Sequence, residues 1–272
     1  MSLAADDVLL RVNPTLGIVL ALLLVAAAGV AAVARLSDSG RRGYARAIGA
    51  AGLRAALQLA AVSYVIGWVV GAVPLLLCFV ALMFAVAVGT AGRRVTRNRT
   101  WWWAALPIGA GVLPVVAVLL LTGLVPLKGI ALIPVTGILI GGALSATVLA
   151  GRRALDELHS RYGEVEAGMA IGLLDREARL EVARPAASDA LLPGLDQTRT
   201  VGVVTLPGAF VGMLLGGASP VMAGAVQLFV LVALLAVQAV AVALVLELVA
   251  RGRLHRNGAG PGSSRLTGAE GE

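Results

Sequence analysis

The residues that could carry chemistry are few and scattered in this sequence. Lys128 is the only lysine, and the Gly129 that follows it does not make the Gly-Lys-Ser/Thr run of a phosphate-binding loop. His159 and His255 lie far apart, and Cys78 stands alone inside an apolar run. No set of histidine, cysteine and carboxylate residues has metal-site spacing within an apolar run, and nothing indicates a serine–histidine–aspartate arrangement in a pocket. We therefore expect neither an active site nor an ATP site in this chain.

The composition instead indicates an integral membrane protein. Hydrophobic residues make up 59% of the chain and charged residues 14%, whereas a soluble domain holds about 45–50% apolar and about 25% charged residues. A helix needs ~20 apolar residues to cross about 30 Å of hydrocarbon. Seven apolar runs approach that length, at 16–35, 50–73, 75–92, 101–124, 130–151, 200–217 and 220–250. The sequence predicts an all-α polytopic fold with about seven transmembrane helices.

The basic residues predict the orientation of these helices. If the runs alternate in direction, 19 of the 22 lysine and arginine residues fall on one side. The positive-inside rule then places the amino terminus outside and the carboxyl terminus in the cytoplasm, in a multi-pass protein of the plasma (inner) membrane. Arginines in turns between apolar runs indicate topology rather than nucleic-acid binding. We expect a membrane domain over 1–250 and a disordered cytoplasmic tail over 251–272.

A few polar residues interrupt the apolar runs. Arg54 at the centre of a span would cost about 2.5–3.5 kcal/mol. Either it extends to the lipid phosphates, with Gln58 one turn deeper on the same face, or it lines a path through the bundle. Gln227 likewise either hydrogen-bonds a neighbouring helix or faces such a path.

Small residues repeat at four-residue spacing in the sixth run. Gly208, Gly212 and Gly216 follow Pro207, and this spacing lets two helices approach closely. The pattern fits packing within one subunit and packing between two subunits equally well.

A long polar segment, residues 152–199, separates the fifth and sixth runs. It carries 9 of the 15 acidic residues and 7 of the 22 basic ones. Val165, Met169, Leu173 and Leu180 recur near one helical face, which predicts an amphipathic helix over 164–185. Its apolar ridge would fit a groove in a partner protein, with Gly172 permitting close approach. The alternative is a helix lying on the bilayer, which the many acidic residues oppose.

A motif within this segment resembles the EAA loop of ABC transporter permeases. Glu166-Ala167-Gly168 is followed after three intervening residues by Gly172, and after nine further intervening residues by Val182-Ala183-Arg184-Pro185. Glu166, Ala167, Gly172 and Pro185 match the loop. The resemblance implies that these four residues couple the chain to an ATPase.

The resemblance extends over residues 45–250. The run Leu206-Pro207-Gly208-Ala209-Phe210-Val211-Gly212-Met213-Leu214-Leu215-Gly216-Gly217 is similar to the signature of the iron-export ABC permease family (FetB-like), which includes plant aluminium-tolerance permeases. It implies helix packing at Pro207, Gly208, Gly212 and Gly216. It also favours a substrate path along Arg54, Gln58, Met213 and Gln227. The chain departs from the family pattern at Gly142 and at 209–213, where polar groups that would meet a hydrated cation are absent.

These observations predict a permease subunit of an ABC transporter that exports iron or another metal ion. It would work as a homodimer with two cytoplasmic ATPase subunits. Those subunits would use the ATP, so this chain would bind no cofactor. Three alternatives stay open: a stand-alone channel or ion-coupled carrier, an ABC permease for a non-metal small molecule such as a nucleotide sugar, and a scaffold that transports nothing.

Overall fold

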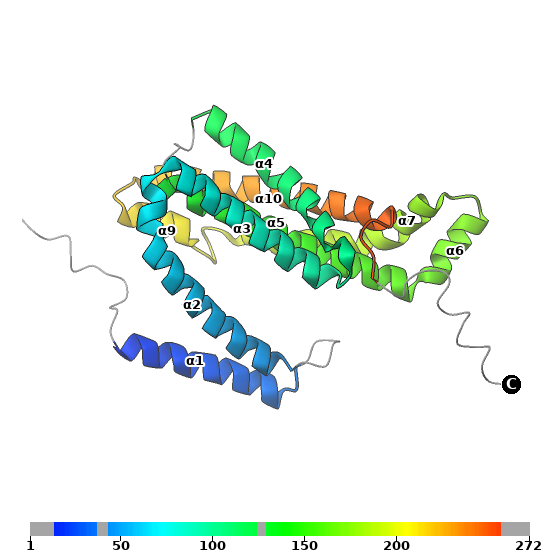
Figure 1. Ribbon diagram of the computed structural model, residues 1–272, viewed down its shortest axis with the longest axis horizontal. Helices are drawn as coiled ribbons and strands as arrows, with labels where there is room; N and C mark the ends of the chain where they lie inside the picture. The colour runs from blue at the N-terminus through cyan, green and yellow to red at the C-terminus, as the bar shows by residue number, and fades with distance from the viewer. Residues whose placement is uncertain (1–13, 37–42, 124–128, 257–272) are drawn as a thin grey trace, which may run out of the picture. The chain divides into compact units, whose positions relative to one another are not determined.

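The computed structural model describes residues 14–36, 43–123 and 129–256. Every regular element in these ranges is a helix, apart from one isolated bridge between Val201 and Thr205, which confirms the all-α prediction. The chain divides into two compact units, Met1–Trp68 and Val69–Glu272 (Figure 1).

The first unit contains α1 (Pro14–Val33) and most of α2 (Tyr44–Gly71). The two helices approach closely at Gly52, because a Cβ there would lie 2.6 Å from Leu24 Cδ1 on α1. Both helices are apolar over most of their length and present long side chains such as Leu22 and Leu57 on their surfaces. Such surfaces suit contact with lipid.

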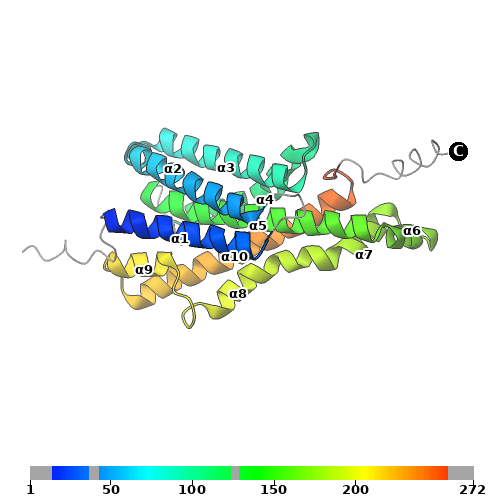
Figure 2. The same cartoon turned by 90° about the horizontal axis from the view of Figure 1, so that it is seen from below.

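The second unit is a helical bundle arranged around α5 (Gly129–Ser160). It contains α3 (Val73–Val95), a 3₁₀ turn η1 (Arg99–Ala104) that leads into α4 (Ala105–Leu121), and α10 (Pro220–Ala250). The helix α5 packs against α3, α4 and α10, and α10 also packs against α4 (Figures 1 and 2). Because α5 and α10 share core clusters in the same order along both helices, they run parallel.

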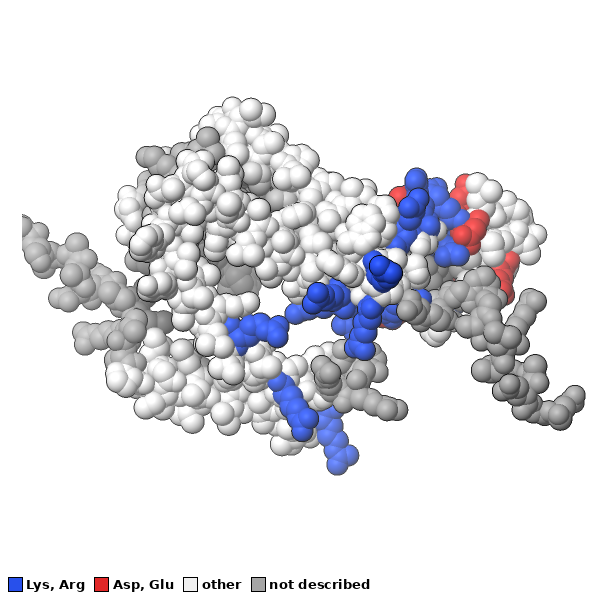
Figure 3. Space-filling model, in the orientation of Figure 1, with Lys and Arg blue, Asp and Glu red and all other residues white. Residues whose placement is uncertain are grey.

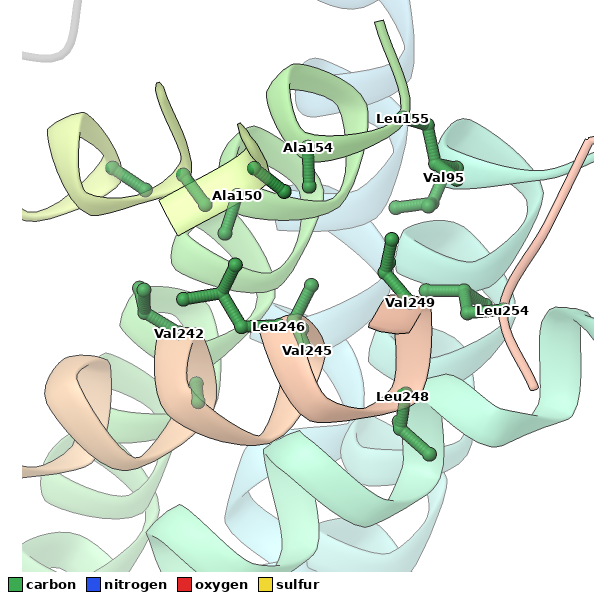
Figure 4. Close-up of a cluster of buried hydrophobic side chains, with 14 of the residues drawn as sticks. Val95, Ala150, Ala154, Leu155, Val242, Val245, Leu246, Leu248, Val249 and Leu254 are labelled. Atoms are coloured by element: carbon green, nitrogen blue, oxygen red, sulfur yellow. The ribbon is translucent and has the colours of Figure 1, made fainter. Parts of the chain in front are cut away.

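The densest part of the core lies where α3, α5 and α10 end. Ala150 and Ala154 of α5 are fully buried, and their small side chains let Val245 and Val249 of α10 pack against that helix (Figure 4). Burial of apolar area contributes about 25 cal/mol per Å², so this cluster ties the three helices into one body at that end.

Six described helices are long and apolar enough to cross a membrane, in place of the seven expected. They correspond to the first five predicted runs and the last, which confirms a polytopic membrane protein. The predicted span over 200–217 is wrong, because its helix, α9 (Gly208–Leu215), has eight residues and is about 12 Å long. A hydropathy count does not detect that the backbone turns at Gly202 (φ +83°) and that Pro207 precedes the helix.

The chain nonetheless returns along α10 in two short helices. The helix α8 (Leu192–Thr200) contacts α10 near its middle, and α9 also packs on α10. Between them the backbone turns, with Gly202 N–H donating to Thr205 C=O at 2.8 Å. Broken helices occur at membrane depth where the rest of the protein or a water-filled cavity surrounds the irregular backbone.

Residues 251–256, which the sequence assigns to the disordered tail, are folded onto the bundle. Leu254 belongs to the core cluster at the helix ends. The carbonyl of His255 accepts hydrogen bonds from Thr96 Oγ1 at 2.8 Å and Asn98 Nδ2 at 2.6 Å. The predicted tail therefore begins too early; residues 257–272 lie outside the described part of the chain.

Candidate functional site

The polar segment 152–199 forms a helical hairpin rather than one helix. It consists of α6 (Tyr162–Ala170) and α7 (Asp175–Ser188), joined at Gly172, whose φ is +102°. Gly172 N–H donates to Met169 C=O and Leu173 N–H to Gly168 C=O, the two bonds of a Schellman cap. A single helix over 164–185 is therefore a wrong prediction. Gly172 ends a helix instead of sitting inside one.

The predicted apolar ridge is covered within the chain itself except at Leu173, which is exposed at the turn between α6 and α7. Val165 is fully buried and packs with Ala178 and Val182 of α7, and Met169 lies against the same cluster. Leu180 packs against the core at the ends of α5 and α10. The periodicity located the apolar face correctly, but that face holds the hairpin together and is not available to a partner.

The apolar surface that is available lies at the turn between α6 and α7. Ile171 is 85% exposed and Leu174 is 69% exposed. Glu166 and Ala167 are exposed on α6, within two turns of Gly172. We call residues 166–174 the hairpin tip. Pro185 lies ten residues into α7, about 15 Å along the helix, so the structure brings together three of the four predicted coupling residues and leaves Pro185 apart.

Ion pairs fix the hairpin to the membrane helices. Arg176 at the start of α7 donates through Nε and Nη2 to both carboxylate oxygens of Glu247 on α10, at 2.8 and 2.7 Å. These hydrogen bonds raise the pKa of Arg176. Arg153 of α5 pairs with Asp189 at 2.8 Å, at the end of α7. The helix α7 also packs directly on α5 and α10.

A second pair of contacts fixes the start of α6. Arg161 donates to Glu157 of α5 at 2.8 Å and to Glu164 of α6. The hydrogen bond from Arg161 lowers the pKa of Glu164. The hairpin is thus anchored to α5 at both of its ends.

Four polar side chains are buried between the membrane helices. Thr136 and Thr147 of α5 and Gln227 and Gln238 of α10 are each less than a tenth exposed. Among the residues that the structure describes, the hydroxyl oxygens of the threonines and the amide oxygens of the glutamines have no hydrogen-bond partner. A buried polar group that stays unpaired costs about 1–3 kcal/mol.

These four residues define two polar levels by their place along each helix. The outer level, Thr136 and Gln227, lies seven residues after the first residue of α5 and of α10, and the inner level, Thr147 and Gln238, lies eighteen residues after it. Eleven residues separate the levels, which corresponds to about 16 Å. The two helices contact each other at Gly142 of α5, where a Cβ would lie 2.2 Å from Leu234 Cδ1 and 3.5 Å from Gln238 Nε2.

The inner level is also where α8 approaches α10. A Cβ on Gly194 of α8 would lie 2.1 Å from Gln238 Oε1 and 3.3 Å from Leu235. Gln238, like Gln227, is a polar residue inside the last apolar run, and Gly142 differs from the family pattern. Nothing in the sequence distinguishes Gly194 from the many other glycines, because the neighbours that require it come from a distant part of the chain.

The four residues predicted to line a path lie in different settings. Gln227 is buried at the outer polar level, and Met213 is half-buried on α9. Arg54 and Gln58 are exposed on α2, in the first unit. The structure therefore places Gln227 among the unpaired polar atoms and gives the other three no recorded polar partner within the described residues.

The described residues show no close helix packing at the glycines predicted for it. A Cβ on Gly208 or Gly212 would meet nothing within 4 Å, and a Cβ on Gly216 would meet only carbonyls of its own helix. Pro207 is half-buried at the start of α9. Four-residue spacing shows that close approach is possible, but the close approaches at glycine occur on other helices, for example at Gly142 of α5 and Gly194 of α8.

A metal site built from protein ligands is not recorded in the part of the chain that the structure describes. No group of three or more histidine, cysteine or carboxylate side chains there could hold an ion. The polar atoms inside the bundle are amide and hydroxyl oxygens, which suit water or a hydrated solute better than a dehydrated transition metal.

Comparison with known proteins identifies the family. The model of the Uncharacterised protein family (UPF0014) matches residues 15–253. The chain belongs to the UPF0014 family. The match includes every described helix except the first residue of α1.

Relatives of this UPF0014 chain include plant and bacterial membrane proteins. The chain is 33% identical to UPF0014 membrane protein STAR2 of Oryza sativa subsp. japonica, over 76% of this chain and 74% of that protein. It is 32% identical to Protein ALUMINUM SENSITIVE 3 of Arabidopsis thaliana, over 65% of this chain and 66% of that protein. It is 29% identical to the Probable iron export permease protein FetB of Escherichia coli (strain K12), over 65% of this chain and 70% of that protein. No solved structure matches.

Proposed function

We propose that this UPF0014 protein is the membrane subunit of an ABC-type exporter and that its hairpin tip binds a separate cytoplasmic ATPase. The single observation that carries the proposal is the exposed apolar tip at Ile171 and Leu174, on a hairpin anchored to α5 and α10. Exposed large apolar side chains on a charged cytoplasmic element are typical of a docking surface. The permease name of the Escherichia coli relative supports the transport role.

The mechanism follows from how the hairpin is attached. Closure of two ATPase subunits around ATP would displace the tip, and a rigid hairpin would carry that displacement into α5 and α10. The helix α5 continues from the bundle to Ser160, directly before α6, so it acts as a lever between the tip and the two polar levels. Small shifts between packed helices alternate access to a path when the packing has two arrangements.

The path in this proposal runs past the two polar levels between α5 and α10. Oxygen atoms without protein partners provide acceptors for water or for the hydration shell of a cation. The proposed cargo is iron or another metal ion, written as substrate rather than as a resident cofactor. The iron-export name of the Escherichia coli relative supports this choice.

The assembly we propose is a homodimer with two ATPase subunits in the plasma membrane, with the hairpin and residue 256 in the cytoplasm. The arginine-rich turns support this orientation. The open glycine face of α9 at Gly208 and Gly212 supports close packing between two copies. A reporter fused after Arg256 is expected to be active only in the cytoplasm, and a tag before Leu3 is expected to be accessible from outside.

The test is recovery of an ATPase that carries a phosphate-binding loop with the purified chain. Changing Ile171→Asp and Leu174→Asp together is expected to abolish that recovery while leaving membrane insertion intact, because both side chains lie outside the spans. The matched control is Ser188→Asp, which adds a charge at the far end of α7. Normal recovery with the double variant would contradict docking through the tip, and transport by the purified chain alone would favour a channel or carrier.

A further inference from the structure

A wide depression lies at the end of the bundle where α3 ends and the chain leaves α10. Its volume is about 950 Å³, and it is lined by three arginines, Trp101, His255 and three small polar residues. The arginines are Arg93 near the end of α3 and Arg97 and Arg99 in the turn before α4. The proposed transport mechanism uses none of these residues.

The small polar residues build the floor of the depression by bonding to one another. Asn98 caps η1, with its side-chain oxygen accepting from Thr100 N–H at 2.9 Å. Thr96 Oγ1 lies 2.7 Å from the same Asn98 oxygen and 2.8 Å from the His255 carbonyl. Asn98 Nδ2 donates to that carbonyl at 2.6 Å. The turn and the segment after α10 are thereby held together as one preformed surface.

The three arginines on this surface have no acidic partner. Within residues 14–36, 43–123 and 129–256, the structure records no ion pair for Arg93, Arg97 or Arg99, and no carboxylate lines the depression. By contrast, Arg161, Arg176 and Arg184 of the hairpin are each paired with a glutamate. Figure 3 shows basic side chains gathered at this end of the second unit, with acidic ones beside them toward the hairpin. Three uncompensated positive charges around one concavity favour an anionic ligand.

Tryptophans place this surface at the level of the lipid headgroups. The guanidinium of Arg93 lies 5.6 Å from the centre of the Trp101 ring, and that of Arg253 lies 5.3 Å from the Trp103 ring. Trp102 and Trp103 stack with ring centres 4.3 Å apart. Tryptophan is enriched at the boundary between hydrocarbon and water. The depression is therefore expected to open where phospholipid phosphates lie.

We propose that this depression binds the phosphate of an anionic phospholipid in the adjacent leaflet. Guanidinium groups bind phosphate oxygens through paired, charge-assisted hydrogen bonds. Arg93 flanks the preformed turn from α3, Arg97 lies within the turn, and Arg99 flanks it from η1. The indole of Trp101 would cover the glycerol part of the headgroup. A bound lipid would thereby connect the turn before α4 with the segment that follows α10.

The test measures how much phosphatidylglycerol stays with the purified full chain after reconstitution in nanodiscs of phosphatidylcholine with a minor fraction of phosphatidylglycerol. Near an anionic surface each arginine contributes about a fivefold gain in affinity. Changing Arg93, Arg97 and Arg99 to Gln together is therefore expected to weaken retention on the order of a hundredfold. Changing all three to Lys keeps the positive charge but removes the planar guanidinium group that binds two phosphate oxygens at once. This variant is expected to show an intermediate loss of lipid retention.

The matched control removes three positive charges elsewhere, with Arg161→Gln, Arg184→Gln and Arg199→Gln in the polar segment. This control is expected to retain the lipid like the unchanged chain. Equal retention by the control and the Arg93/Arg97/Arg99 variant would overturn the proposal, as would displacement of the lipid by millimolar inorganic phosphate, which would assign the site to free phosphate. If the Arg93/Arg97/Arg99 glutamine variant no longer recovered the ATPase but retained the lipid fully, the proposal would also be overturned. The arginines would then be assigned to a contact with a protein.

Discussion

The hairpin and the interface between α5 and α10 both carry polar side chains, but these differ in their exposure to water and in their hydrogen-bond partners. On the hairpin nearly every charge has a partner and lies near water, as with Arg161 between Glu157 and Glu164. In the interface four polar oxygens are buried and have no hydrogen-bond partner among the described residues. Paired surface charges cost little and fix geometry. Unpaired buried oxygens destabilise the fold, and the proposed function assigns them to the transport path.

Substitution of Gly172 in the hairpin is expected to have the largest effect, on recovery of the ATPase. Any L-residue there is strained at a φ of +102°, by about 1–3 kcal/mol. Gly172→Trp adds a bulky side chain to the hairpin tip and is expected to abolish recovery of the ATPase. Gly172→Ala is expected to reduce it, because alanine loses the helix-ending conformation and gains nothing from helix propensity.

The measurement for Gly172 is ATPase recovery from membranes that hold equal amounts of each variant, together with hydrogen exchange of α6 and α7. Gly163→Ala on α6 is the control, since its Cβ would meet nothing within 4 Å and its backbone is helical. If the Gly172→Ala chain bound the ATPase more tightly and its turn between α6 and α7 were better protected from hydrogen exchange, the result would favour a single helix over 164–185.

The next largest effect is expected where α8 meets α10. Gly194→Ala places a methyl group 2.1 Å from Gln238 Oε1, so that side chain must move within a packed interface. Overpacking of this kind costs about 1–3 kcal/mol. Gly208→Ala on α9 is the control, because the added methyl meets nothing within 4 Å. Thermal unfolding in detergent is expected to show a clear loss for the first variant and none for the second; equal melting temperatures would contradict the observed contact.

These sites show which features of the structure can be predicted from the sequence and which cannot. The apolar runs fix which segments enter the membrane, and six of the seven predicted spans appear as long helices. Periodicity identified the apolar face of α6, but it does not say which element covers that face, and Val165 turned out to meet α7. Hydropathy alone also missed the turn at Gly202. Gln238 and Gly194 lie 44 residues apart in the sequence, so only the fold brings them together.

A smaller effect, with opposite signs for stability and transport, is expected at the polar levels. Gln227→Leu and Gln238→Leu each remove a buried oxygen without a partner, which is expected to stabilise the chain by about 1–3 kcal/mol. The same changes are expected to lower transport, because the path loses an acceptor for water or a hydrated ion. Melting temperature and metal efflux from cells would be measured together. A variant that is both less stable and less active would indicate a packing role instead.

The smallest effect on stability is expected from the contact that joins the two regions. Arg176→Gln removes the paired hydrogen bonds to Glu247 on α10, but both side chains are partly exposed and Glu247 keeps Arg251 as a partner. The melting temperature should therefore change little. Transport should fall much more than stability if the hairpin moves α10 through this pair, because ATPase closure would then displace the tip without moving the helix.

Two further variants test whether the expected loss of transport is specific to the Arg176–Glu247 contact between the hairpin and α10. Arg184→Gln breaks an exposed pair with Glu181 within α7 and is expected to leave transport unchanged. Arg176→Lys keeps the charge and is expected to restore part of the transport, since an ammonium group makes one of the two contacts to Glu247. In each variant the ATPase should still be recovered with the chain, because the tip itself is intact. If Arg176→Gln transported normally with the ATPase bound, movement would have to reach the polar levels through α5 alone, by way of the continuous helix that leads to the hairpin.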